Sequence, residues 1–308
     1  WLRDASISLP GLTLTTGRFG EAKKVFRRFA QFESGGLLPN KIYDPEKANS
    51  AEARVLLDEK KDLVDRMEKL YADLKSMGAE DAARKPLEEQ IELRKKRFLQ
   101  ITKHIETGGL NYNNADSPMW FIHAIEEYDR IYRMEHDGRG DENFLKEMKP
   151  VIENILKGYG KSKDEATAIY YHRDQYHTIY NEDRRVVSPK QATWMDAWPD
   201  IPEPVTPRAG AAVEINAMYY SGLRFLAGLE QKFGKAETVS EINAEADEVK
   251  KKFNEKFWNP GYEADPNATP LLDYYVDGNL ANPNEHQGAI RPNMIFAVSH
   301  GGDLLSPE

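Results

Sequence analysis

Apolar residues recur at helical spacing in several stretches of the chain, separated by polar stretches rich in glycine, proline and asparagine. Within these stretches, apolar side chains return every three or four positions, which is the period of an amphipathic helix. The pattern predicts five helices, at 20–32, 118–132, 144–159, 211–233 and 239–257. Strand-like alternation is scarce. We therefore predict an all-α fold, with function gathered on the loops between the helices.

Residues 44–106 differ from the rest, because they are dense in lysine, arginine and acids and nearly lack aromatic residues. Leu56, Leu63, Leu70 and Met77 fall seven positions apart, and a similar apolar stripe resumes after Gly78. This pattern predicts an inserted helical hairpin with a narrow apolar seam, an antiparallel coiled coil that turns near Gly78. A solvated projection, a lid over neighbouring loops and an arm for homo-oligomerisation are all compatible with it.

Bulk composition narrows the class of partner. The net charge of -9 and the pI of about 5.5 argue against a nucleic-acid backbone or an anionic membrane, whereas a neutral polymer remains compatible. The chain has no cysteine, which excludes disulfides and a cysteine nucleophile and fits a cytoplasmic protein. It opens at Trp1 without a methionine or a signal-like segment, so we expect a piece of a longer protein.

One short region concentrates side chains suited to an uncharged polyol such as a sugar. Trp194 offers a flat apolar face, and Arg208 and Asn216 are donors that read hydroxyls. Asp196 is flanked by apolar residues, and desolvation there would raise the pKa of its carboxyl toward neutrality. Glu214 adds a second acid. A helix start with a buried aromatic and a capping aspartate explains the same residues without any chemistry.

Patterns for other kinds of chemistry are missing from the sequence. The seven histidines show no spacing typical of a metal site. Neither a phosphate-binding glycine loop nor a serine nucleophile motif is present. We therefore expect no metal and no cofactor.

Several loop motifs follow one another in a definite order. They are Trp-Leu-Arg-Asp at 1–4, Thr-Gly-Arg at 16–18, Gly-Leu-Leu-Pro-Asn at 36–40, Asn-Tyr-Asn-Asn-Ala-Asp-Ser-Pro-Met-Trp-Phe at 111–121, Trp-Met-Asp at 194–196, Thr-Pro-Arg at 206–208, Val-Glu-Ile-Asn at 213–216 and Arg-Pro-Asn at 291–293. In this order they resemble the amylo-α-1,6-glucosidase domain of glycogen debranching enzymes. The resemblance covers nearly the whole chain except 44–106.

The resemblance implies an (α/α)6 toroid, in which six inner and six outer helices surround a sugar pocket. It also implies inverting hydrolysis of single α-1,6-linked glucose stubs on glycogen or a branched α-glucan, with Asp196 as the general acid. Inversion needs a second carboxylate about 6.5–9.5 Å away, which the resemblance places beyond Glu308. Outside 44–106, too few residues remain for twelve helices of about 12 residues, so we expect an incomplete toroid.

The resemblance also implies a set of sugar-binding residues. They are Trp1, Arg3, Asp4, Asn40, Asp116, Trp120, Trp194, Arg208, Glu214, Asn216, Arg291 and Asn293. Structural roles are open alternatives for several of them: an ion pair between Glu214 and Arg208, a buried ion pair that joins helix starts for Arg3, and core packing for Trp120. For the whole chain, an inverting α-glucoside phosphorylase and a non-catalytic glucan-binding fragment are the alternative functions.

Overall fold

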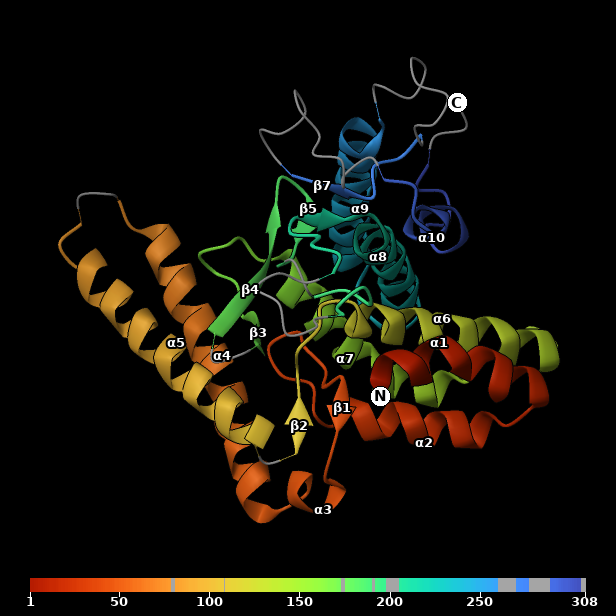
Figure 1. Ribbon diagram of the computed structural model, residues 1–308, viewed down its shortest axis with the longest axis horizontal. Coiled ribbons are helices and arrows are strands. Elements are labelled where there is room, and N and C mark those ends of the chain that lie inside the picture. Colours follow the sequence, from red (N-terminus) through yellow and green to blue (C-terminus); the bar gives the residue numbers. More distant parts are fainter. Residues whose placement is uncertain are drawn as a thin grey trace.

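The computed structural model describes residues 1–78, 81–107, 109–172, 175–189, 192–197, 205–259, 270–276 and 289–305. This part of the chain is mostly helical (Figure 1), as predicted. The helices are α1 (Leu2–Leu12), α2 (Phe19–Ala30), α3 (Pro45–Ala48), α4 (Ala51–Ser76), α5 (Arg84–Thr107), α6 (Ser117–Glu135), α7 (Glu142–Gly160), α8 (Val213–Phe233), α9 (Ala236–Phe257) and α10 (Asn293–Ser299), with a 3-10 turn at Leu14–Thr16. The five helices predicted from apolar spacing are confirmed as α2, α6, α7, α8 and α9.

Four helices, α1, α6, α8 and α10, pack on one another and carry site residues at or just before their first turns. Helix α1 packs on α6, α6 on α8, and α8 on α10, while α7 and α9 pack against α8. Buried aromatic side chains pack the helices against one another. The ring centres of Phe26 on α2 and Phe121 on α6 lie 5.6 Å apart, edge to face, and those of Tyr128 on α6 and Phe144 on α7 lie 4.7 Å apart. The arrangement of these helices in a six-hairpin ring stays a prediction.

The three-stranded antiparallel sheet was not predicted. Strands β3 (Ala168–His172), β4 (Gln175–Glu182) and β5 (Arg185–Val187) pair in that order. The segment is rich in tyrosine, isoleucine and valine, which favour strands. Its tight turn uses Asp183 and Arg184, both with positive φ (47° and 64°), so the usual Asn-Gly signal of such a turn is absent.

Two short pairings close loops near the helix starts. Strand β1 (Lys41–Ile42) pairs with β2 (Leu110–Asn111), and β6 (Ala211–Ala212) pairs with β7 (Tyr274–Tyr275). Because β6 runs directly into α8, its pairing with β7 brings the segment around residue 273 to the first turn of that helix.

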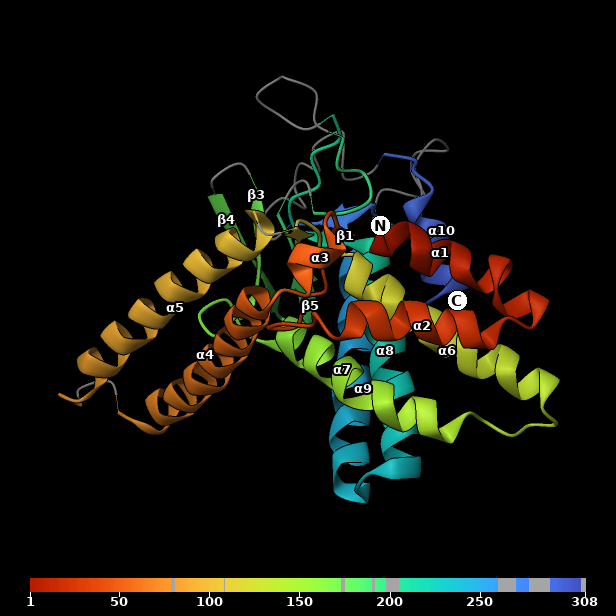
Figure 2. The ribbon, with the colours of Figure 1, turned by 90° about the horizontal axis from the view of Figure 1, so that it is seen from below.

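Helices α4 and α5 lie side by side and project from the rest of the molecule (Figures 1 and 2). The predicted turn near Gly78 falls between them, where residues 79 and 80 lie outside the described part. The buried stripe differs from the predicted one: Leu56, Leu70 and Met77 are only half-buried, and the buried positions of α4 are Leu57, Lys60, Leu63, Met67 and Tyr71. The stripe is shifted because α4 packs against more than α5. The ammonium of Lys60 lies over the ring of Phe98 on α5 and over that of Tyr112 in the body.

Among the helices that the structure describes, none combines the length and the apolar character that crossing a membrane requires.

Candidate functional site

Arg3, in the first turn of α1, joins two carboxylates from distant parts of the chain. Its Nε and Nη2 donate to the two carboxylate oxygens of Asp116 at 2.8 Å each, and its Nη1 donates to Oδ2 of Asp196 at 3.1 Å. Asp116 immediately precedes α6 and is fully buried, whereas the side chain of Asp196 is 35% exposed. The predicted residues Arg3, Asp116 and Asp196 therefore meet at one point.

Burial and charge act against each other in this group. Burial raises the pKa of Asp116, which the adjacent Arg3 guanidinium opposes, while the carboxylates of Glu214 and Asp196 raise it further. For Arg3, burial alone lowers the pKa, but Asp116 and Asp196 raise it above its ordinary value. Arg3 is thus a permanent cation, and it faces the more exposed carboxylate of Asp196.

A second group centres on Arg208, whose side chain is fully buried. Its Nη1 and Nη2 donate to the two oxygens of Glu214 at 2.6 and 2.7 Å, and its Nε donates to Oδ2 of Asp273 at 2.7 Å. Nη1 also donates to Oγ1 of Thr193 at 3.2 Å. Every guanidinium nitrogen of Arg208 therefore donates to a protein oxygen, and the ion pair with Glu214 that the sequence left as an alternative is present.

Both carboxylates keep the Arg208 guanidinium charged. Burial alone lowers the pKa of Arg208, and Glu214 and Asp273 raise it above its ordinary value. The side chains of Glu214 and Asp273 are as fully enclosed as that of Arg208. A buried charge is tolerated only when it is paired and hydrogen-bonded, and this group meets both conditions.

Asp273 connects this group to the predicted residues near the C-terminal end. Its Oδ2 accepts from Nη1 of Arg291 at 2.6 Å, and its Oδ1 accepts from Nδ2 of Asn293 at 2.6 Å. Oδ1 of Asn293 in turn accepts from Nε1 of Trp194 at 2.8 Å. Sequence reasoning missed Asp273 because no local motif surrounds it. Its only signal is that two arginines in the predicted site require carboxylates.

Three further predicted residues are enclosed by the protein. Asn216 exchanges hydrogen bonds with the backbone of Val186 at 2.7 and 3.0 Å. Asn40 accepts from the hydroxyl of Ser117 at 3.0 Å. Trp120 is buried against Phe296 and His300, and its indole nitrogen has no hydrogen-bond partner among the described residues. Core packing, the alternative for Trp120, is what the structure contains.

Two predicted tryptophans and one acid are instead open to solvent. Trp1 is 56% exposed and Trp194 is 38% exposed, and Asp4 is also exposed. The ammonium of Lys41 lies 4.4 Å from the ring centre of Trp1, a cation–π contact that holds one face of the indole. These side chains, with Asp196, form the accessible part of the predicted site.

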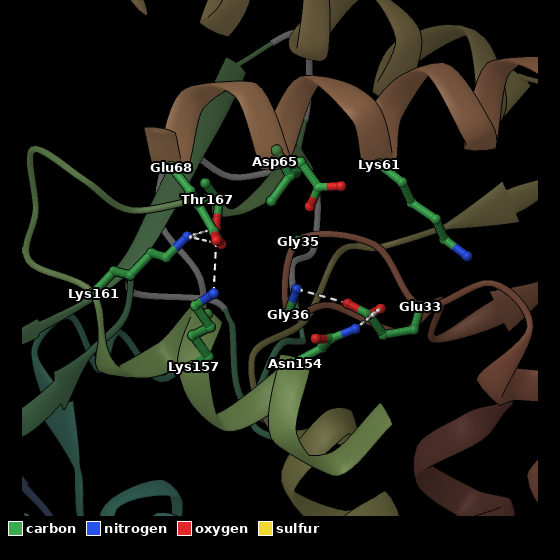
Figure 3. Close-up of a pocket in the computed structure, with 12 residues that line it drawn as sticks. Glu33, Gly35, Gly36, Lys61, Asp65, Glu68, Asn154, Lys157, Lys161 and Thr167 are labelled. Carbon is green, nitrogen blue, oxygen red and sulfur yellow. Dashed lines mark hydrogen bonds and ion pairs between the residues drawn. The ribbon is translucent and has the colours of Figure 1, made fainter. Parts of the chain in front are cut away.

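A separate polar cleft of roughly 240 Å³ lies between α4 and α7 and shares no residue with the predicted site (Figure 3). Glu68 of α4 accepts from the ammonium groups of Lys157 and Lys161 at 2.6 Å each. Deeper in, Glu33 accepts from the backbone N–H of Gly36 at 3.0 Å, and burial raises the pKa of its carboxyl. These paired charges brace α4 against α7.

The family model described as amylo-alpha-1,6-glucosidase matches residues 1–57 and 81–308 of the chain. The unmatched stretch, 58–80, begins within α4. A glycogen debranching enzyme of Saccharomyces cerevisiae is 25% identical over 343 aligned residues, which cover 100% of this chain and 20% of that protein. The chain therefore spans about a fifth of the length of this relative.

Proposed function

The chain belongs to the amylo-alpha-1,6-glucosidase family, and on that premise we propose that it hydrolyses α-1,6-linked glucose stubs on glycogen or a branched α-glucan, with inversion at the anomeric carbon. The observation that carries the proposal is the difference in access among the carboxylates that meet at the helix starts. Asp116, Glu214 and Asp273 are fully buried, whereas Asp196 is about one-third exposed. Of these four carboxyls, Asp196 is therefore the one that a bound glucan can reach.

Asp196 acts as the general acid that protonates the glycosidic oxygen as the bond to the anomeric carbon breaks. Arg3 holds its Oδ2. Within the described part of the chain, Oδ1 of Asp196 has no hydrogen-bond partner, which leaves one oxygen to face the substrate. Arg3 is fixed by its two bonds to the buried Asp116, so it sets the orientation of the acid.

The general base comes from beyond Glu308 in this proposal. Asp116 is a poor base because both its oxygens are held by Arg3. Glu214 is equally poor because both its oxygens are held by Arg208 and its side chain is fully enclosed. An activating carboxylate must reach a water on the far face of the sugar, and neither of these residues is free to do so.

The predicted sugar-binding residues divide into two groups on this view. Trp1, Asp4 and Trp194 are exposed and contact the glucan, the indoles as apolar platforms and the carboxylate as a hydroxyl acceptor. The others lie behind these side chains and support the site: Arg3, Asn40, Asp116, Trp120, Arg208, Glu214, Asn216, Arg291 and Asn293.

The test is to offer the full-length protein a limit dextrin that carries single α-1,6-glucosyl stubs, with and without phosphate. The proposal predicts free glucose at the same rate in both, first appearing as the β-anomer by NMR. Glucose 1-phosphate formed only with phosphate would overturn hydrolysis in favour of a phosphorylase. Binding of the dextrin without either product would instead mark a glucan-binding protein.

A further inference from the structure

We propose that Asp273 is a positioning residue for the general acid, and that it acts by holding Asn293 and Arg208 on the segment at 193–195 that leads into Asp196. The inference rests on the proposed function, since it concerns how the acid of that reaction is placed. Asp273 contacts neither Asp196 nor the accessible part of the site in the described structure. Its effect therefore has to pass through Asn293 and Arg208.

The first arm runs through Asn293. Oδ1 of Asp273 accepts from Nδ2 of Asn293 at 2.6 Å, which fixes the plane of that amide. The Asn293 amide then contacts two residues that precede Asp196. Its Oδ1 accepts from the indole N–H of Trp194 at 2.8 Å, and its Nδ2 lies 3.2 Å from Sδ of Met195. Asn293 itself is fully buried, so it has no solvent alternative to these partners.

The second arm runs through Arg208. Asp273 holds Nε and Nη2 of the guanidinium, and Nη1 then donates to Oγ1 of Thr193 at 3.2 Å. The same hydroxyl oxygen accepts from the backbone N–H of Met195 at 3.3 Å. All three residues that precede Asp196 are thus bound to groups that Asp273 holds.

The position of Asp273 is itself built into the fold. Pairing of Ala212 with Tyr274, and of Ala211 with Tyr275, fixes the backbone on its C-terminal side. Its carbonyl oxygen accepts from the first N–H of α8, that of Val213, at 3.1 Å. The carboxylate therefore transmits the position of the start of α8 to the acid-bearing segment.

The charge of Asp273 is also required by its surroundings. Two guanidinium groups, from Arg208 and Arg291, donate to its Oδ2 at 2.7 and 2.6 Å. An amide at this position would keep an oxygen acceptor but lose the negative charge, and it would present N–H donors to one of the guanidinium or amide donors. The expected result is a rearranged network and a displaced acid.

A displaced general acid has a specific kinetic signature. In the stub, the leaving group is a sugar oxygen, and breaking the glycosidic bond needs protonation of that oxygen. Fluoride leaves α-glucosyl fluoride with little help from an acid. A residue that acts through Asp196 should therefore matter for the stub and much less for the fluoride. A change that merely loosens the fold or weakens glucose binding would lower both rates alike.

The experiment compares kcat and KM on the stub dextrin and on α-glucosyl fluoride for full-length wild type, Asp273→Asn and Asn293→Ala. The control is Glu230→Gln, which removes a buried carboxylate in the last turn of α8 that pairs with Lys149, away from the site. We expect kcat on the stub to fall by roughly 10- to 100-fold in both test variants, with a fall of less than about threefold on the fluoride. The control should keep the wild-type ratio of the two rates.

Two results would overturn the inference: an unchanged ratio in Asn293→Ala, or an equal fall on both substrates in every test variant that folds. Asn293→Ala leaves no buried charge without a partner, so it decides the question even if Asp273→Asn does not fold. Asp196→Asn separates the two proposals. If it keeps full rate on the stub, the proposed function fails. If it loses that rate while the ratio stays unchanged in Asn293→Ala, only the role of Asp273 fails.

Discussion

Two arginine–carboxylate pairs with nearly identical hydrogen-bond lengths lie in opposite environments. Arg208 holds Glu214 through two bonds of 2.6 and 2.7 Å at the start of α8, and Arg97 holds Glu59 through two bonds of 2.7 and 2.8 Å across the α4–α5 hairpin. Both partners of the first pair are fully buried, whereas those of the second are 47% and 36% exposed. Hydrogen-bond length alone therefore does not tell which pair matters more for the stability of the fold.

The difference lies in what replaces a lost partner. In the hairpin, water solvates the remaining charge, so the pair contributes little. At the start of α8 no water is available, and the remaining charge would be left buried, which costs far more than the pair itself contributes. The hairpin charges thus keep a surface solvated, while the charges around Arg208 enforce one arrangement of the loops that carry the site.

The largest change in stability is expected for Glu214→Gln, which leaves Arg208 with one carboxylate fewer in a fully buried place. We expect the free energy of unfolding to fall by about 3–5 kcal/mol, measured by urea denaturation. A fall of less than about 1 kcal/mol would mean that the buried pair behaves like an exposed one, and the contrast between the two regions would be lost.

A smaller effect is expected for Arg3→Lys, since Arg3 is only partly enclosed. Lysine keeps the positive charge but cannot bind both oxygens of Asp116 and also reach Asp196. We expect unfolding to become easier by about 1–3 kcal/mol and glucose release to slow with it. Wild-type stability together with a wild-type rate would show that the forked geometry is unimportant.

A pH effect is expected at the packed rings beside α10. Burial and the neighbouring His123 lower the pKa of His300 from 6.5 to about 4, against an opposing effect of Glu127. Between pH 6.5 and about 4 the unfolded chain binds a proton that the folded chain does not. The contribution of neutral His300 is thus fully present above pH 6.5 and is lost as the pH falls toward 4.

The variant His300→Phe keeps a ring against Trp120 and removes this titration. Its melting temperature should decline less than that of wild type between pH 7 and pH 4.5. Equal declines of the melting temperature in the two proteins would contradict the lowered pKa of His300.

The smallest effect is expected for Glu59→Gln in the hairpin. Water replaces the lost partner of Arg97, so the urea midpoint should not change measurably. A clear loss of stability would show that the Arg97–Glu59 pair is not the solvated contact that its exposure indicates. The contrast between the exposed pair and the buried Arg208–Glu214 pair would then fail.

Local patterns in the sequence were enough to predict the helices, because three- and four-residue spacing is a property of each segment alone. Motif order was enough to bring Arg3, Asp116 and Asp196 forward as site residues, and they meet in the structure. The pairing of Arg208 with Asp273 was out of reach, since the two residues are 65 positions apart. Lys60 was unpredictable for a related reason: its burial depends on rings from two other segments.

The most direct test of the account is the rate of glucose release from a limit dextrin by full-length wild type and by Asp196→Asn, with Asp4→Asn as an exposed acidic neighbour for comparison. Loss of a general acid predicts a fall of about 100-fold or more for Asp196→Asn, with unchanged urea unfolding. Asp4→Asn should change mainly KM, since it replaces a charged hydroxyl acceptor with a weaker neutral one and leaves the acid in place. A wild-type rate in Asp196→Asn would contradict the account.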